Sequence, residues 1–457
     1  MKMKKKIKCL LAAMLAFAMV ISTVPQGVFA AEPKKLTVST QEELNAALKN
    51  SNLTALTIAS DDSLKLVIKS NILPNLTITL NVPFGTVTNN ASIKKLKVKS
   101  AKTLNEKASG NNIDISDDKL TLKIAKNASV GTVNVTSENA NLKVTNNGSV
   151  NTISVKGSNS DIKLTNNGQL NTLGVSGEGS SLDLTNNAEL KTVNVKSSEG
   201  DIKVTNAGTV DTFRVKSDNV TMNFTNKGNM NILGVKSDNA KIMMTNNSTV
   251  NTLGVSGEGS SLDLTNNADL KTLNVRGGDA DIKVTNNGNL KKLNVYAKSD
   301  IAIEGSTKSQ TNVVVKPAAE GASIETAAPV KLQAAAEVNV TLKKGAGLST
   351  VTLTSEDAGV KLVNETAKKI AVTDSEGNTQ KVKAGKEASI GETTSLTKEE
   401  TPSTTEEKTE EKTEEKTEEK TEEKTEEKTE EKTEEKAEEK TEEKTEEKAE
   451  EKKKKLN

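Results

Sequence analysis

Apolar residues recur with a period of 20 between residues 141 and 300. When each unit is numbered from its first residue (141, 161, 181 and so on), positions 2, 4, 10, 13 and 15 are apolar in all eight units, and position 15 is always Val. Positions 2 and 4 alternate with mostly polar neighbours, as do positions 13 and 15. This alternation is typical of β-strands, whereas an amphipathic helix needs a spacing near 3.6. Each unit therefore predicts two short strands.

The strands are separated by two polar corners in every unit. One corner falls at Asn-Asn-Gly, for example Asn146-Asn147-Gly148, and the other near positions 17–20. Because Asn and Gly tolerate a positive φ, we expect the Asn-Asn-Gly corner to use one. A single unit cannot bury its apolar side alone, so successive units must stack as coils with parallel strands about 4.8 Å apart. The sequence predicts an all-β fold, a right-handed parallel β-solenoid with 20-residue coils, since parallel crossovers favour that hand.

Position 6 is Asn in all eight units, while position 7 varies and becomes Ala207 or Lys227. We expect the position-6 amides to hydrogen-bond from coil to coil inside the corner as a structural ladder. The alternative is that Asn is present only as a good turn former. The predicted ladder residues are Asn146, Asn166, Asn186, Asn206, Asn226, Asn246, Asn266 and Asn286.

The N-terminal region predicts a signal peptide and then a cap. Residues 1–30 combine five lysines, an apolar run from Cys9 to about Val24 and a small-x-small cleavage site, which together predict export. Residues 31–52 predict the cap, with a strand at 36–38 and a short helix at 42–49. Thr40 and Glu43 have the spacing of a capping box at the start of that helix.

Weaker copies of the pattern extend the solenoid over 53–395, which allows about 17 coils of about 20 residues. Residues 396–457 form the C-terminal tail, in which 405–452 consists of twelve tetrapeptides, ten Thr-Glu-Glu-Lys and two Ala-Glu-Glu-Lys. A period of four places like charges at i,i+4, which disfavours a helix. We expect the tail to be largely disordered.

Composition restricts the chemistry. The chain has no His, its single cysteine is Cys9, and aromatic residues make up 1%. Side-chain chemistry that needs His or a pair of thiols is therefore excluded, and we expect no catalysis, no cofactor and no metal. The body, 31–400, carries a net charge of only +5, which does not predict nucleic-acid binding. No terminal apolar span follows the body, so we expect no insertion in a membrane. We also expect a monomer.

Two kinds of surface column, one acidic and one of Thr, allow other interpretations. Acidic residues around the second corner are potential Ca²⁺ ligands, although acidic residues also simply keep turns soluble. They are Glu138, Glu178, Glu199, Asp218, Asp238, Glu258 and Asp279. Thr columns at positions 5 and 12 resemble an ice-binding pattern. That function needs paired columns on one face, and position 14 is Ser, Gly, Asn or Arg. Thr is also a common exposed strand residue.

The cap motif Val38-Ser39-Thr40…Glu43-Leu44…Ala46-Ala47-Leu48 and the repeated L-x-T-L-x-V strand with its T-N-N-G turn resemble secreted right-handed parallel β-helix repeat proteins of the Gram-positive bacterial surface. Their architecture is similar to that of pectate lyase, and the resemblance covers about 35–395. It implies a secreted or loosely surface-associated protein. The same architecture serves lyases, adhesins and surface-layer proteins, so it does not fix an activity.

We therefore expect a non-catalytic structural or adhesive rod with a charged tail, whose partners are cell-wall polymers or extracellular glycans. The alternative is a polysaccharide-binding or polysaccharide-lyase-like protein on the same fold. A lyase would need acidic residues clustered with Arg or Lys, and the only arginines are Arg214 and Arg276.

Overall fold

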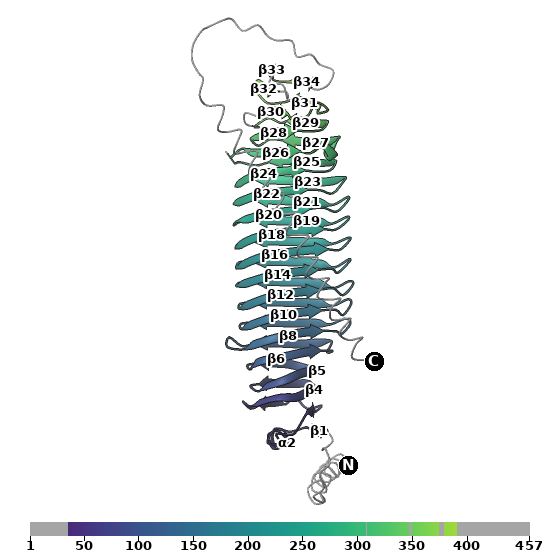
Figure 1. Ribbon diagram of the computed structural model, residues 1–457, viewed down its shortest axis with the longest axis vertical. Coiled ribbons are helices and arrows are strands. Elements are labelled where there is room, and N and C mark those ends of the chain that lie inside the picture. The colour runs from purple at the N-terminus through teal and green to yellow at the C-terminus, as the bar shows by residue number, and fades with distance from the viewer. Residues whose placement is uncertain (1–34, 308, 347–349, 374–378, 391–457) are drawn as a thin grey trace, which may run out of the picture. The chain divides into compact units, whose positions relative to one another are not determined.

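The computed structural model describes residues 35–307, 309–346, 350–373 and 379–390. The predicted signal peptide (1–30) and the predicted tail (396–457) lie outside these ranges. The described residues form an all-β parallel solenoid of about 16 turns, close to the 17 expected, and the predicted fold class is confirmed. Figure 1 shows the coils stacked one above another from β4 to β31. Among the described residues, no helix has the length and apolar character needed to cross a membrane.

Each coil contributes one strand to each of two sides of the solenoid. The even side contains repeat positions 9–15 and the odd side contains positions 1–6, while β4 and β5 are long enough to serve both sides. The strands of the even side are β1 (Lys35–Val38), β2 (Ala55–Ala59), β4 (Ile72–Asn89), β5 (Ser92–Glu106), β6 (Ser109–Ile115), β8 (Ser129–Val135), β10 (Ser149–Val155), β12 (Gln169–Val175), β14 (Glu189–Val195), β16 (Thr209–Lys216), β18 (Asn229–Lys236), β20 (Val250–Val255), β22 (Asp269–Val275), β24 (Asn289–Val295), β26 (Thr311–Val315), β28 (Val330–Ala334), β30 (Thr350–Leu353), β32 (Ile370–Thr373) and β33 (Thr379–Val382). Those of the odd side, besides β4 and β5, are β3 (Lys65–Ile68), β7 (Lys119–Ile124), β9 (Asn141–Asn146), β11 (Asp161–Asn166), β13 (Ser181–Asn186), β15 (Asp201–Asn206), β17 (Thr221–Asn226), β19 (Lys241–Asn246), β21 (Ser261–Asn266), β23 (Ala280–Asn286), β25 (Ser299–Glu304), β27 (Ala322–Thr326), β29 (Val338–Leu342), β31 (Val360–Asn364) and β34 (Lys386–Ile390). A short 3-10 helix spans Pro317–Ala319.

The core is a set of aliphatic columns, because the strands pair in a register of 20 residues. Ile162 lies beside Leu182 and Leu164 beside Leu184, so each apolar position stacks on its own copy. The residues at positions 2, 4, 10, 13 and 15 are buried. The two largest fully buried side chains, Phe213 and Phe224, meet edge to face with ring centroids 5.6 Å apart. Inward residues from both sides thus fill one thin interior.

The corner after the even side uses left-handed backbone. Position 19 has φ between 50° and 66° in every coil from Asn139 to Asp279. Its N–H donates forward to the next coil, as from Asn159 to the Glu178 carbonyl at 2.7 Å, whereas the residue directly after the strand, such as Lys156, donates back to the preceding coil. Asn or Gly occupies six of these eight positions, since both tolerate this conformation.

The expectation of a positive φ at Asn-Asn-Gly is wrong. No described residue at positions 6–8 of these coils has one. At Asn146 and Asn246 the side chain spans the turn instead: Asn146 Oδ1 accepts the N–H of Gly148 at 3.0 Å, and Asn246 Oδ1 accepts that of Ser248 at 3.4 Å. An inward amide that bonds two residues ahead closes the corner without left-handed backbone.

The N-terminal end is covered by helix α2 (Gln41–Ala47), shorter than the 42–49 expected because Leu48 is its C-cap. Thr40 Oγ1 accepts the Glu43 N–H at 3.2 Å, but Glu43 returns its carboxylate to the Ser39 N–H at 2.7 Å rather than to Thr40. Leu44 is fully buried against the first coils. Gln41 covers the open edge of β3, since its side-chain amide accepts from Val67 N at 2.7 Å and donates to Val67 O at 2.9 Å.

The C-terminal end changes strand direction. Within the region where the sequence predicts weaker coils, β30 and β31 both pair in parallel with the preceding coils. After them β33 pairs antiparallel with β32, and β34 pairs antiparallel with β31. Both sides of the solenoid therefore end on a reversed strand that cannot continue the parallel coil.

Candidate functional site

The eight asparagines at position 6 form one continuous column inside the solenoid, which we call the inner ladder. All eight are fully buried. The Nδ2 of each residue donates to the Oδ1 of the asparagine in the next coil, through seven hydrogen bonds of 2.8–2.9 Å that link Asn146 to Asn286. Most of these amides also donate across the corner to the position-9 carbonyl of the next coil, as Asn146 does to Gln169 O at 3.1 Å. A buried polar column of this kind is stable because its amides are paired.

The ladder has a direction and two ends. Every Nδ2 points toward the C-terminal end, so the amide dipoles add along the column. At the last rung, Asn286 Nδ2 has no hydrogen-bond partner among the described residues. At the first rung, the column continues toward the N-terminus with Ile124, which lies beside Asn146. The amide chain therefore covers eight coils and is bounded by an aliphatic residue on one side.

Below Ile124 the same column holds a buried carboxylate that the sequence analysis did not identify. Glu106 is fully buried and lies between Asn89 and Ile124 in the strand register. Its carboxylate accepts from Asn89 Nδ2 and Asn111 Nδ2 at 3.0 Å, and from Ala108 N at 2.9 Å. Burial raises the pKa of Glu106 from its ordinary 4.5 to about 7, although these hydrogen bonds act in the opposite direction. The available signal was a Glu in the column that elsewhere holds Asn.

A second amide stack runs outside the corner at position 7. Asn167 Nδ2 donates to Asn147 Oδ1 at 2.9 Å, and Asn187 donates to Asn167 at 2.8 Å. The same bond recurs from Asn267 to Asn247 at 2.9 Å. These bonds point toward the N-terminal end, opposite to the inner ladder, and they are exposed. Where Ala207 and Lys227 replace Asn the stack is interrupted, so the outer stack is tolerant of substitution.

The acidic residues proposed as Ca²⁺ ligands lie at positions 18 and 19 and are all exposed. Where they follow one another at position 18 they bind backbone: the Asp238 N–H donates to Asp218 Oδ1 at 3.2 Å, and the Glu258 N–H donates to Asp238 Oδ1 at 2.8 Å. Within the described ranges, no group of three or more acidic or thiol ligands is close enough to hold a metal ion. We call this column, Glu138, Glu178, Glu199, Asp218, Asp238, Glu258 and Asp279, the acidic corner.

The outward positions 11, 12, 14 and 16 carry the opposite charge. Over residues 141–300 they hold ten basic residues and one acidic residue, Asp211, and the exposed position 9 at the start of the even-side strands adds two acidic residues, Glu189 and Asp269. We call this surface the basic face; its cations are Lys156, Lys191, Lys196, Arg214, Lys216, Lys236, Lys271, Arg276, Lys291 and Lys292. The outward positions 1, 3 and 5 of the odd side hold five basic and five acidic residues over the same stretch. Charge is thus separated around the circumference.

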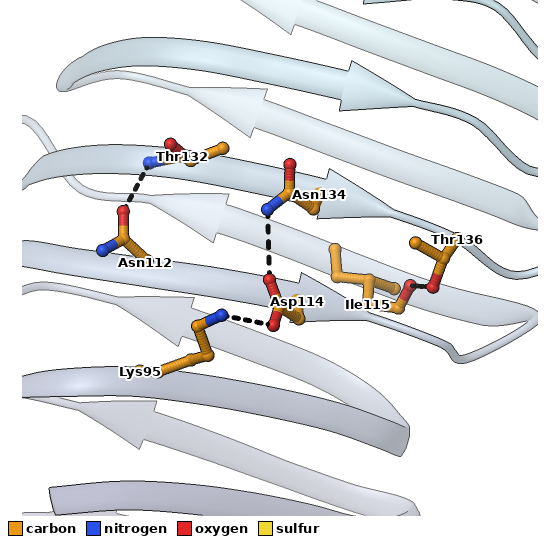
Figure 2. A network of polar contacts seen from close by, with 7 residues as sticks. All are labelled: Lys95, Asn112, Asp114, Ile115, Thr132, Asn134 and Thr136. Carbon is orange, nitrogen blue, oxygen red and sulfur yellow. Dashed lines mark hydrogen bonds and ion pairs between the residues drawn. The ribbon is translucent and has the colours of Figure 1, made fainter. Parts of the chain in front are cut away.

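On the N-terminal side of the basic face, outside the repeats 141–300, lies the polar network in Figure 2. Lys95 Nζ lies 2.8 Å from Asp114 Oδ2, and Asn134 Nδ2 donates to Asp114 Oδ1 at 3.1 Å. Partial burial alone would raise the pKa of Asp114, but the hydrogen bonds from Lys95 and Asn134 and the charges of Lys95 and Lys97 outweigh it and lower the pKa. Asp114 is therefore held in its ionised form, and the lysines beside it offset its negative charge.

Comparison with known proteins gives one family. The sequence profile of Toastrack DUF4097 matches residues 53–362, more than half of the chain. The chain belongs to the Toastrack DUF4097 family. The Toastrack region contains the inner ladder, the acidic corner and the basic face. No curated protein and no solved structure matches the chain significantly. The Toastrack assignment agrees with a repeat β-solenoid, and by itself names no substrate or partner.

Proposed function

We propose that this Toastrack protein is a non-catalytic, exported or surface-associated rod with a structural or adhesive role. One observation carries the proposal. Of the three positions that are identical in all eight repeats, Thr at 5, Asn at 6 and Val at 15, two point into the stack of coils. The Asn and the Val are buried, and the Asn forms the inner ladder. Sequence identity is therefore concentrated on extending the stack, as suits a spacer.

The placement of the titratable groups supports a non-catalytic role. A carboxyl group with a raised pKa is a frequent mark of an active site. Here the clearest example, Glu106, has no exposed surface and contacts Asn89, Asn111 and backbone. A substrate would have to open the corner of the coil to reach it. We interpret Glu106 as a buried structural acid.

The export part of the proposal is supported by residues 1–30, whose composition is that of a signal peptide. Attachment to a Gram-positive envelope is the expectation from the resemblance to surface β-helix proteins. Both are tested by fractionating native cells into medium, wall, membrane and cytosol and detecting the protein with an antibody. We expect it in the medium or the wall. Detection only in the cytosol would refute export.

A polysaccharide-active protein is the second candidate, and the basic face favours a binding form of it. Catalysis is tested by incubating the purified full-length chain with polygalacturonate, with and without Ca²⁺, and following viscosity. We expect no decrease relative to a heat-denatured sample. A steady decrease that scales with protein concentration would replace the structural proposal with a lyase or hydrolase.

A further inference from the structure

We infer that the basic face is a binding surface for a linear anionic glycan that lies along the stack, across successive coils. The inference names a class of ligand for the proposed surface protein. It rests on the proposed function only in assuming that the protein is exported to where such a polymer occurs. The ligand chemistry is a sugar or polyol chain with a carboxylate or phosphodiester charge in each repeat.

The charge pattern selects a polyanion. Position 16 is the last residue of β16 and β18 and directly follows the other even-side strands of the repeat. It carries a cation in five of eight coils: Lys156, Lys196, Lys216, Lys236 and Arg276. All five are exposed, and Arg276 is braced by Tyr296, with the guanidinium carbon 4.7 Å from the ring centroid. Coils are about 4.8 Å apart, so a linear chain along the column passes a cation every one or two coils. A regular row of cations matches a polymer with regular anions.

The neighbouring surfaces limit where the polymer can lie. Directly after position 16 comes the acidic corner, and positions 17–20 hold no basic residue between 137 and 280. An anionic chain is repelled from that side. The odd side has balanced charge and offers no net attraction. The potential is therefore most favourable for an anion over the even side alone.

The rest of the basic face suits a glycan. Position 12 is Thr in six of the eight coils, and position 14 is mostly Gly, Ser or Asn. At Gly174, Gly234 and Gly254 a Cβ atom would meet no other atom within 4 Å, so open space lies between the Thr column and the cations. Hydroxyl and amide groups beside this space can hydrogen-bond sugar hydroxyls. Aromatic platforms for stacked bases, by contrast, are few in a chain with 1% aromatic residues.

The test measures binding of the purified full-length chain to polygalacturonate, poly(glycerol phosphate) and neutral dextran. We expect binding to at least one anionic polymer, weakened by added salt, and none to dextran. The first two arms distinguish a carboxylate from a phosphodiester ligand. The variant K156Q/K196Q/K236Q should lose about tenfold in affinity, since three surface cations are removed.

A matched variant controls for net charge. K143Q/K203Q/K283Q removes the same number of exposed lysines from position 3 on the odd side and should keep wild-type affinity. A steric variant, G174V/G234V/G254V, fills the open space without changing charge and should also weaken binding several-fold. Circular dichroism and melting curves of all three variants show whether the solenoid is intact. Equal loss in the two lysine variants would overturn the assignment to this face.

Other occupants are separate outcomes. Tighter binding of double-stranded DNA than of either anionic glycan would refute the inference, as would equal binding of dextran. Sedimentation velocity without polymer tests whether the basic face docks on the acidic corner of a second copy. Self-association lost in K156Q/K196Q/K236Q would assign the face to that contact. A cytosolic location would leave the binding result standing and refute only the surface role.

Discussion

At the scale of single residues, the inner ladder makes two neighbouring asparagines, Asn166 and Asn167, differ in what they contribute to stability. Asn166 accepts from Asn146 and donates to Asn186 inside the core, while Asn167 makes the same kind of bonds in solvent. Asn166→Ala should lower the free energy of unfolding by about 2 kcal/mol, because buried amide groups lose their partners. Asn167→Ala should change it by less than about 0.5 kcal/mol.

Hydrogen–deuterium exchange across 160–190 measures this difference coil by coil, which suits a repeat protein that need not unfold in one step. We expect faster exchange around the missing rung in Asn166→Ala and little change in Asn167→Ala. Equal effects of the two substitutions would mean that position 6 is Asn only for its turn propensity.

Glu106 gives the protein a pH-dependent stability. Below pH 4.5 the carboxyl is neutral in both the folded and the unfolded chain. As the pH rises from 4.5 to about 7, the unfolded chain releases this proton while the folded chain keeps it, so the free energy of unfolding falls. The loss is about 3 kcal/mol above pH 7. Glu106→Gln should remove it, so the variant should melt higher than wild type at pH 8 and similarly at pH 4.

Melting curves between pH 4 and pH 8 test this, with the exposed Glu138→Gln as control. The control should follow wild type at every pH. A wild-type stability that rises between pH 5 and pH 7, through a step absent from Glu106→Gln, would mean that the folded protein favours the ionised carboxylate.

Glu199 occupies a left-handed corner position with φ of 59°, where most other coils have Asn or Gly. Glu199→Asn should therefore stabilise the protein by about 0.5–1 kcal/mol, since Asn adopts this conformation more readily. Thermal melting measures the gain, and Glu178→Asn, at the neighbouring position 18, should give none. A lower melting temperature for Glu199→Asn would show that the Glu side chain itself contributes to the corner.

At the scale of elements, the local stability of the first odd-side strand, β3, depends on the side chain of Gln41. Gln41 fills both hydrogen bonds that Val67 on β3 would otherwise offer at an open edge. Gln41→Ala should increase amide exchange in 65–68 about tenfold, the effect of losing roughly 1.4 kcal/mol of local stability. Gln41→Glu should be at least as harmful, because a carboxylate would face the Val67 carbonyl.

The elements of the central coils are predictable from sequence because a period of 20 forces each residue to lie on its own copy. Alternation fixes which residues point inward, and an invariant inward Asn points to a paired amide. The corners are harder to predict, because Asn occurs in both: at position 6 it bonds with its side chain, and at position 19 it supplies left-handed backbone.

Other features carry no repeat signal. The strands β33 and β34 reverse direction after the periodicity has faded, so nothing in 379–390 indicates antiparallel pairing. Glu106 lies in a coil whose spacing to its neighbours differs from 20, since it pairs with Asn89 and Ile124. The basic face was recognisable only once positions 11, 12, 14 and 16 were known to share one surface.

At the scale of the whole described solenoid, the number of coils should be adjustable in steps of 20 residues. Deleting 181–260 joins Ser180 to Ser261 and recreates the Gly-Glu-Gly-Ser-Ser sequence found at both original junctions. Asn166 would then stack beneath Asn266. We expect a folded, cooperatively melting protein with the same circular dichroism spectrum per residue.

Deletion of 181–250 is the matched control, since it removes three and a half coils and brings an odd-side strand onto an even-side strand. We expect this protein to aggregate or to melt without cooperativity. If both deletions fold equally well, register between coils is not what holds the stack together.

The two closed ends have an evolutionary consequence. Both are encoded outside the repeat, by Gln41 and α2 at one end and by β33 and β34 at the other. Unequal crossing-over between 172–195 and 252–275, which are nearly identical, would lengthen or shorten the gene while leaving both closures intact. Descendant proteins could differ in their number of coils without exposing an unpaired strand edge at either end. The length of the solenoid can therefore change neutrally or under selection.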